Sequence, residues 1–333
     1  MRQTNLFSFS NTSLGLGPNT RVVDLFCGIG GFSCGAQKAG HRVVLAVDSD
    51  PFLLGCHVRN NTDCEHICCE LPRDDLPLPT EGIWHLHGSP PCQRLSIMQP
   101  HQYKEDRQHA VDLVAWFFSL VKSSKHTSWS MEQVNHRAVR EQLDDLKRKH
   151  PSVFDWMVVD AVDYEVAQHR KRIIAGSPFL IANLRFSKSK KRKLCVRDVI
   201  PDPPRPFIRN SLYSRPDEKT QELKEVPLKD QIRTVDEPCY TILSTGYAPC
   251  YSNSLCVSIL RCLPCVNRHK KWADEKGIVL RHLTGAEGAL IQSFPPDYLL
   301  PWNSTQSLVG VGNALPPNLA CALMEPTAVF YKL

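Results

Sequence analysis

The sequence predicts an α/β protein in which a doubly wound Rossmann-like sheet is joined to a smaller, loop-rich domain. In the first half of the chain, short apolar runs alternate with amphipathic stretches. The first apolar run, RVVDLF at 21–26, leads into a glycine-rich turn, CGIGG at 27–31. Periodicity is then lost between 178 and 275. Strands that alternate with helices favour a parallel sheet with both faces covered, and we expect the first half to form it.

The individual elements follow from the hydrophobic periods. Strands are expected at 21–26, 41–48, 83–88, 128–134, 155–164 and 172–177. Helices are expected from the glycine turn to about residue 39, and at 51–61, 107–124 and 136–150. The helical pattern returns from about 281, so the C-terminal segment should pack back on the first domain. The expected organisation is a tail at 1–19, a main domain of 20–177 and 278–333, and a second domain at 178–277.

Composition limits the class of protein. Of the 333 residues, 42% are hydrophobic and 22% charged, which is ordinary for a globular enzyme. No window approaches the roughly 18 uncharged apolar residues of a membrane span. The net charge of +6 favours a polyanionic partner. The 14 cysteines, in a chain whose N-terminus does not resemble an export signal, indicate reduced thiols in a cytoplasmic or nuclear compartment.

The glycine turn and the end of the second strand together predict a nucleotide-type cofactor site. Glycines let the backbone approach a ligand, and the following helix offers spare amide donors. Asp48 lies 20 positions or so further on, where an acidic residue can bind ribose hydroxyls. The plainer alternatives are a structural glycine turn and an ordinary carboxylate at a strand end.

A cysteine follows the third expected strand, in GSPPCQRLS at 88–96. Open α/β sheets bind ligands at the carboxyl ends of their strands, and the two prolines stiffen the loop that carries the thiol. Cys92 is therefore a candidate nucleophile, and the alternative is one inert thiol among the 14.

Six segments, in order, resemble the motif set of the DNA cytosine-5 methyltransferase family: DLFCGIGG, SPPCQ, MEQV, QHRKR, RHLTGAE with SFP, and VGNALPP. The resemblance runs from about 21 to 320. It implies a class I methyltransferase sheet, S-adenosylmethionine as cofactor, and a target-recognition domain at 178–277. It also implies duplex DNA as partner, with the target cytosine flipped out of the helix. We expect a monomer and no metal site.

The resemblance assigns roles to residues. Cys92 would add to carbon 6 of cytosine, and Glu132 would stabilise the charge that builds at ring nitrogen 3. Arg170 and Arg172 would hold the flipped base and the active-site carboxylate. The implied cofactor residues lie in and after the glycine turn, with one close to the C-terminus: Asp24, Phe26, Gly28, Gly30, Gly31, Asp48, Glu70 and Asn313. Thr284 and Glu287 are expected to be structural.

Several features leave alternatives open. Gln133 stands where the family usually has Asn after the catalytic Glu, and that Asn is thought to support the cysteine loop. The segment CYT at 239–241 is similar to an element of a related branch that methylates transfer RNA, so RNA is the second candidate substrate. A methyltransferase fold that binds without turnover is a third reading. The run KSKKRK at 188–193 fits a nuclear import signal, a phosphate-contacting stripe or a solvated charge run.

Overall fold

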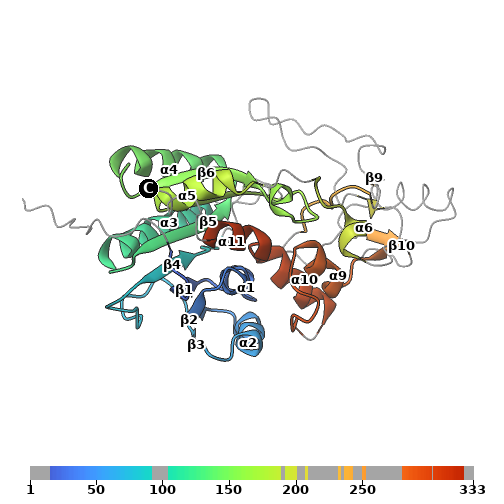
Figure 1. Ribbon diagram of the computed structural model, residues 1–333, viewed down its shortest axis with the longest axis horizontal. Helices are drawn as coiled ribbons and strands as arrows, with labels where there is room; N and C mark the ends of the chain where they lie inside the picture. Colours follow the sequence, from blue (N-terminus) through green and yellow to red (C-terminus); the bar gives the residue numbers. More distant parts are fainter. Residues whose placement is uncertain are drawn as a thin grey trace, which may run out of the picture.

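The computed structural model of the chain describes residues 16–91, 104–188, 192–200, 207–208, 232–233, 236–242, 250–252, 280–301 and 303–325. Figure 1 gives the arrangement of these parts. Cys92 and most of the expected second domain lie outside the described residues.

The first half of the chain forms strands and helices close to the expected positions. The strands are β1 (Arg21–Leu25), β2 (Arg42–Asp48), β3 (Glu65–Cys68), β4 (Trp84–Gly88), β5 (Ser128–Val134), β6 (Asp155–Asp160) and β7 (Lys171–Gly176). The helices are α1 (Gly31–Lys38), α2 (Pro51–Asn60), α3 (Lys104–Ser123), α4 (Arg137–Lys149) and α5 (Pro178–Phe186). The N-terminus of α2 illustrates how the local sequence sets where a helix begins. The Asp50 side chain accepts hydrogen bonds from the Phe52 and Leu53 amides, and Pro51 stands at the first helical position.

Among the described residues, seven strands form one sheet in the order β3-β2-β1-β4-β5-β7-β6. The prediction of a parallel sheet was wrong at one strand, because β7 pairs antiparallel with both β5 and β6. Two details also differ from expectation. β3 was not predicted, and the stretch expected as a strand to 164 turns after Asp160 into a 3-10 helix, Ala161–Tyr164.

Helices cover both faces of the sheet, as expected for a doubly wound fold. Neighbouring residues of β1 point to opposite faces: Val23 and Leu25 join the cluster that contains α3 and α4 residues, whereas Val22 joins the cluster that contains α1 and α5 residues. The strands are therefore apolar on both sides, which explains their continuous hydrophobic runs.

The C-terminal helices return to the first domain. These are α9 (Gly285–Ile291), α10 (Ser304–Asn313) and α11 (Pro317–Met324). In Figure 1, α11 lies beside α1 and α5, and its Leu319 and Leu323 are fully buried there. The stretch Gln306–Met324 is long and apolar enough to be compared with a membrane span, but 72% of it is buried inside the protein. The segment is part of the hydrophobic core, and it is divided between α10 and α11.

The described parts of the middle region form short strands. They are β8 (Phe207–Ile208), β9 (Ile232–Arg233), β10 (Cys250–Ser252) and β11 (Leu280–His282), in an antiparallel sheet ordered β11-β10-β8-β9. A short helix, α6 (Val196–Val199), lies nearby in Figure 1. By contrast, α5 packs with the main sheet, so the main core extends past residue 177.

Candidate active site

Three predicted motifs meet at the end of the main sheet where the parallel strands terminate. The glycine turn follows β1, the Ser89-Pro90-Pro91 segment follows β4, and Glu132 stands near the end of β5. In the sheet these strands are neighbours, and they run parallel. Their carboxyl ends therefore lie together, which is where open α/β sheets bind ligands.

The glycine turn is fixed from two sides. The Gly28 amide donates to Asp48 Oδ2 at 2.8 Å, so the end of β2 holds the turn. Gly30 has a φ of 90°, and a Cβ there would lie 2.7 Å from the Tyr298 hydroxyl, which itself donates to the Ile29 carbonyl. Only glycine suits that combination of backbone conformation and space.

The C-terminal motif VGNALPP lies against the same turn. A Cβ on Gly31 would be 2.2 Å from the Leu315 carbonyl oxygen, so the two segments touch through their backbones. Asn313, the last residue of α10, is exposed two positions before this contact. The contact brings the segment that carries Asn313 beside the glycine turn, from the opposite end of the chain.

Two carboxyl groups flank the turn: Asp24 is buried and Asp48 is half-buried. Burial raises the pKa of Asp24 to about 7, opposed by the hydrogen bond from Ser33 and increased by nearby Asp48. Burial also raises the pKa of Asp48, although its oxygens accept from the Gly28 and Asp50 amides at 2.8 and 2.9 Å. Asp24 Oδ1 is buried without a hydrogen-bond partner among the described residues. A cationic, polar ligand would compensate both groups.

Two other predicted cofactor residues stand at this edge. Phe26, the first residue after β1, has a φ of 58° and packs edge-on against Trp116, with ring centroids 6.1 Å apart. A bulky residue held in the left-handed region is a mark of functional sites. Glu70 is exposed just beyond β3, next to the end of β2, where Cys69 donates to the Asp48 carbonyl.

Glu132 and Arg172 form the predicted pair. Glu132 on β5 is 7% exposed, and Arg172 Nε on β7 lies 2.7 Å from its Oε1. Burial raises the pKa of Glu132, and the guanidinium groups of Arg172 and Arg170 oppose that shift. Because β7 pairs antiparallel with β5, Arg172 at its start lies near Glu132. The strand whose direction was predicted wrongly therefore contributes a site residue.

Gln133 supports the loop that leads to Cys92. Its Nε2 donates to the Pro90 carbonyl at 3.0 Å, and its Oε1 accepts from the Val134 amide at 2.7 Å. Gln133 is 1% exposed and Pro90 is buried. The supporting contact expected of the family's Asn is therefore made by this Gln. The cysteine itself lies outside the described residues, two positions beyond Pro90.

Arg170 is placed differently from its neighbour. It is 1% exposed, and its guanidinium donates to three backbone carbonyls, those of Ile242, Gly312 and Ala314, at 2.7 to 3.1 Å. It thus ties the segment around 242 and the VGNALPP segment to the sheet. Its influence on Glu132 is through charge.

The CYTI segment at 239–242 packs against QHRKR. Cys239 is fully buried, and its amide and carbonyl bond to the backbone of Ala167 and His169. Thr241 Oγ1 donates to the His169 carbonyl at 2.5 Å. The segment that suggested a transfer RNA substrate therefore packs against the QHRKR segment and helps to hold it in place.

Sequence reasoning missed several buried polar residues that hold the site together. Gln292 Nε2 donates to the Val311 and Ala314 carbonyls, and its Oε1 accepts from Gln168. A second group is the chain Ser89–His87–Ser130–His85, in which each hydroxyl and ring nitrogen pair lies 2.8 to 3.0 Å apart. The alternation of histidines in WHLHG was a signal, because polar side chains inside a buried strand need partners.

Thr284 and Glu287, which were expected to be structural, form a reciprocal capping box at the start of α9. The described cations of KSKKRK pair with acids: Lys188 and Lys193 with Asp163, and Arg192 with Asp198. These exposed pairs favour the solvated charge run over the phosphate stripe.

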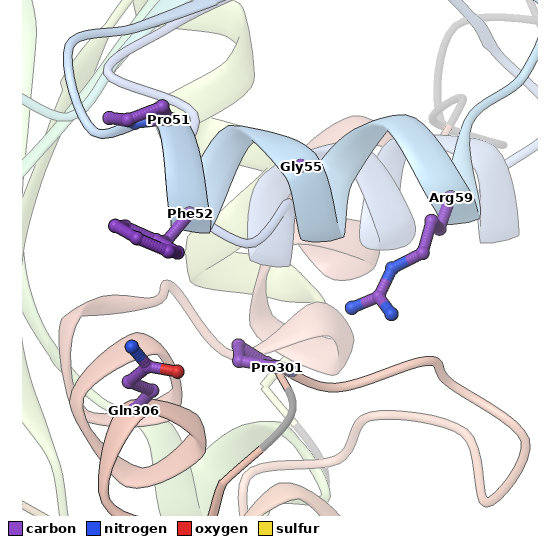
Figure 2. A pocket seen from close by; sticks show the side chains of 6 residues that line it. All are labelled: Pro51, Phe52, Gly55, Arg59, Pro301 and Gln306. Atoms are coloured by element: carbon purple, nitrogen blue, oxygen red, sulfur yellow. The ribbon is translucent and has the colours of Figure 1, made fainter.

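A separate pocket lies between α2 and the segment leading into α10 (Figure 2). Figure 2 shows Phe52 and Arg59 on α2 facing Pro301 and Gln306 across it. None of its lining residues is a predicted site residue: Pro51, Phe52, Gly55, Arg59, Pro301 and Gln306.

Comparisons with known proteins identify the family of the chain. The family model for "C-5 cytosine-specific DNA methylase" matches residues 20–327. The type II methyltransferase M.HgiDI of Herpetosiphon aurantiacus is 27% identical, over 90% of this chain and 91% of the relative. M.XorII of Xanthomonas oryzae pv. oryzae is 29% identical, but over only 46% of this chain and 39% of the relative. A crystal structure of Spodoptera frugiperda DNMT2 has a TM-score of 0.58 at 16% identity, covering 92% of this chain and 98% of that one, which supports the fold.

The two sequence relatives are bacterial enzymes and lend no support to the nuclear location suggested by the basic run. The family match confirms the predicted fold, family and methyl donor. The chain belongs to the C-5 cytosine-specific DNA methylases, enzymes that transfer a methyl group from S-adenosylmethionine to carbon 5 of cytosine in DNA.

Proposed function

We propose that this chain methylates cytosine in duplex DNA through a transient bond between Cys92 and carbon 6 of a flipped-out base. The observation that carries the proposal is the convergence of Glu132 and the segment Ser89-Pro90-Pro91, which directly precedes Cys92, at the carboxyl ends of two neighbouring strands. Carbon 5 of cytosine is a weak nucleophile, and addition of a thiolate at carbon 6 turns the ring into an enamine that is reactive at carbon 5.

Glu132 is the acid for this step. Its raised pKa favours the protonated carboxyl, which can donate to ring nitrogen 3 as negative charge builds on the base. Arg172, 2.7 Å away, fixes the direction in which the carboxyl points. Gln133 donates to the Pro90 carbonyl and so holds the residues that directly precede Cys92 against the end of β5. Arg170 acts as a positioning residue that holds the surrounding segments.

S-adenosylmethionine supplies the electrophilic methyl group. The residues around the glycine turn fit this ligand, because it carries a net positive charge and the turn is flanked by Asp24 and Asp48 with few compensating groups. Asp48, at the end of β2, would take the ribose hydroxyls, and the exposed Glu70 lies beside it. Phe26 and Asn313 would border the ligand on the turn and C-terminal sides.

We rank DNA above transfer RNA. The CYT segment that favoured RNA has its cysteine buried and its threonine hydroxyl bonded to the His169 carbonyl, so both side chains serve packing. We propose that the strands β8 to β10 belong to the target-recognition domain predicted at 178–277, that β11, paired with β10, marks its boundary, and that DNA lies between this domain and the carboxyl ends of the main-sheet strands. Base flipping is required because carbon 6 is covered inside a stacked duplex.

The test is methyl transfer from labelled S-adenosylmethionine to duplex DNA and, in parallel, to transfer RNA. Wild-type protein should label DNA, and Cys92→Ala should not. Cys68→Ser, which changes an exposed free thiol, is the matched control and should keep activity. DNA containing 5-fluorocytosine should trap a denaturation-resistant adduct, because the fluorine blocks release of the cysteine. Transfer to RNA alone, or equal transfer by Cys92→Ala, would contradict the proposal.

A further inference from the structure

A chain of polar side chains connects the protein surface to the buried carboxyl beside the glycine turn. His66 Nε2 on β3 lies 2.8 Å from His57 Nδ1 on α2, and His57 Nε2 lies 2.9 Å from Ser33 Oγ on α1. Ser33 Oγ donates to Asp24 Oδ2 on β1 at 2.6 Å. His57 and Ser33 are fully buried, Asp24 is 1% exposed, and His66 is half-buried.

The hydrogens of this chain have a fixed direction when Asp24 is ionised. Ser33 has one hydrogen and gives it to the carboxylate, so its oxygen must accept from His57 Nε2. Burial, with neighbouring His66, lowers the pKa of His57 to about 3, so its ring is neutral and Nδ1 must accept. His66 Nε2 is then the donor. All three bonds point toward Asp24.

The surroundings of Asp24 hold no fixed cation among the groups that shift its pKa. Burial is the largest influence, and Asp48 on β2 adds to it. His87, opposite Asp24 on β4, is neutral because burial lowers its pKa far below neutral. Three further groups feel the charge of Asp24 and stay neutral, because burial and, in part, Asp24 raise their pKa values: Cys27, Cys64 and Tyr298.

The methyl donor and its by-product differ in charge at one atom. S-adenosylmethionine is a sulfonium cation, and S-adenosylhomocysteine is a neutral thioether that has lost the methyl group. A buried carboxylate attracts the first and gains little from the second. Asp24 Oδ1, which has no partner among the described residues, is the part of the carboxyl left for a ligand.

We propose that Asp24, linked to solvent through Ser33, His57 and His66, lets the enzyme distinguish the methyl donor from the spent by-product: it gives up a proton when the donor binds and takes one back when the by-product remains. This extends the proposed function, since it requires the donor to be held at the glycine turn. Asp24 binds, and the other three position its proton and carry it.

The proton path balances. On return, a solvent proton binds His66 Nδ1, and the hydrogen on His66 Nε2 moves to His57 Nδ1. The hydrogen on His57 Nε2 moves to Ser33 Oγ, and the Ser33 hydrogen moves to Asp24 Oδ2. Each ring stays neutral at the end, and the three hydrogen bonds have reversed direction. Donor binding runs the same steps backwards and releases one proton at His66.

Calorimetric titration in two buffers of different ionisation enthalpy tests the proposal. A carboxyl with a pKa of about 7 is half protonated at pH 7, so donor binding should release about half a proton. By-product binding should release close to none. The Kd for the donor should be roughly fivefold weaker at pH 6 than at pH 7, because below the pKa the proton competes with the ligand.

Two variants test the buried end of the chain, at Asp24 and Ser33. Asp24→Asn should remove proton release and narrow the affinity ratio between donor and by-product. Ser33→Ala removes a donor to the carboxylate and should move the midpoint of the pH profile upward. His150→Gln, on the C-cap of α4, is the control and should change neither quantity. Equal proton release for both ligands, or an unchanged value in Asp24→Asn, would overturn the proposal. If Asp24→Asn does not fold, the wild-type comparison of the two ligands still decides. Absence of any donor binding would instead contradict the cofactor site itself.

Discussion

Replacement of Gln133 by Ala should slow methyl transfer without weakening binding of the methyl donor. Gln133 bonds β5 directly to the loop that leads to Cys92, through its 3.0 Å bond to the Pro90 carbonyl. The substitution removes that donor, together with the acceptor that serves the Val134 amide at 2.7 Å. The glycine turn is held by other residues, so the cofactor site should be unaffected.

The size of the effect follows from the buried carbonyl. A buried acceptor left without its partner costs about 1–3 kcal/mol. If that free energy now holds the loop in its productive position, its loss reduces the transfer rate by roughly 5- to 150-fold, at about 1.4 kcal/mol for each factor of ten. Gln133→Asn keeps the amide but shortens its reach by about 1.5 Å. It should give an intermediate rate.

The assay is single-turnover transfer from labelled donor with enzyme in excess over DNA, alongside direct measurement of donor Kd. Gln142→Ala is the matched control, because it removes an equivalent bond, from Gln142 Nε2 to the Val111 carbonyl at 3.0 Å, away from the sheet edge. A Gln133→Ala rate within twofold of wild type, or an equal loss in Gln142→Ala, would refute the reasoning.

Three further outcomes are expected. Glu132→Gln should lower the single-turnover rate by roughly 10²- to 10⁴-fold, because it removes the general acid. In the wild type the rate should fall as pH rises through the raised pKa of Glu132. A rate that is flat or rises over that pH range would exclude a protonated carboxyl as the acid. Ser130→Ala should reduce the free energy of unfolding by about 2–4 kcal/mol in denaturant titrations, because it breaks two buried bonds to histidines, whereas exposed Ser123→Ala should be neutral. Gly31→Ala should abolish donor binding or folding, measured by calorimetry and thermal melting, whereas Gly55→Ala, in open space on α2, should be tolerated or stabilise by about 0.5–1 kcal/mol.

The sequence predicted the elements whose apolar pattern is strong. The runs at 21–26 and 83–88 are buried on both faces, so their continuous hydrophobicity identified them. β3 was missed because Glu65–Cys68 is an edge strand with no buried residue, and it has no pattern to read. The direction of β7 could not be predicted, because alternation gives the same signal whether a strand runs up or down the sheet.

Some features of the site could likewise be predicted from the sequence, and others could not. Motif resemblance identified residue types and their order, and the structure places Asp24, Glu132 and Arg172 near the carboxyl ends of β1 and β5. It could not give the partner of a side chain whose contact lies far away in sequence. Arg170 bonds to carbonyls 72 and 142 positions away, and His57 reaches His66 and Ser33 on two different elements. Such contacts depend on how helices cross the sheet, which no local spacing encodes.

The two acids of the site, Asp24 and Glu132, should titrate independently, and each should be detected by a different measurement. Asp24 and Glu132 are separated by β4, whose inward-facing His85 and His87 are neutral because burial lowers their pKa values. The strand between them therefore supplies charge to neither acid. The sulfonium sets the state of Asp24, and the base sets that of Glu132. Donor affinity should accordingly strengthen as pH rises through about 7 and be indifferent to Glu132→Gln, whereas the rising-pH loss of single-turnover rate should disappear in that variant. A shift of the donor-binding midpoint in Glu132→Gln would show that the two carboxyls are coupled across β4.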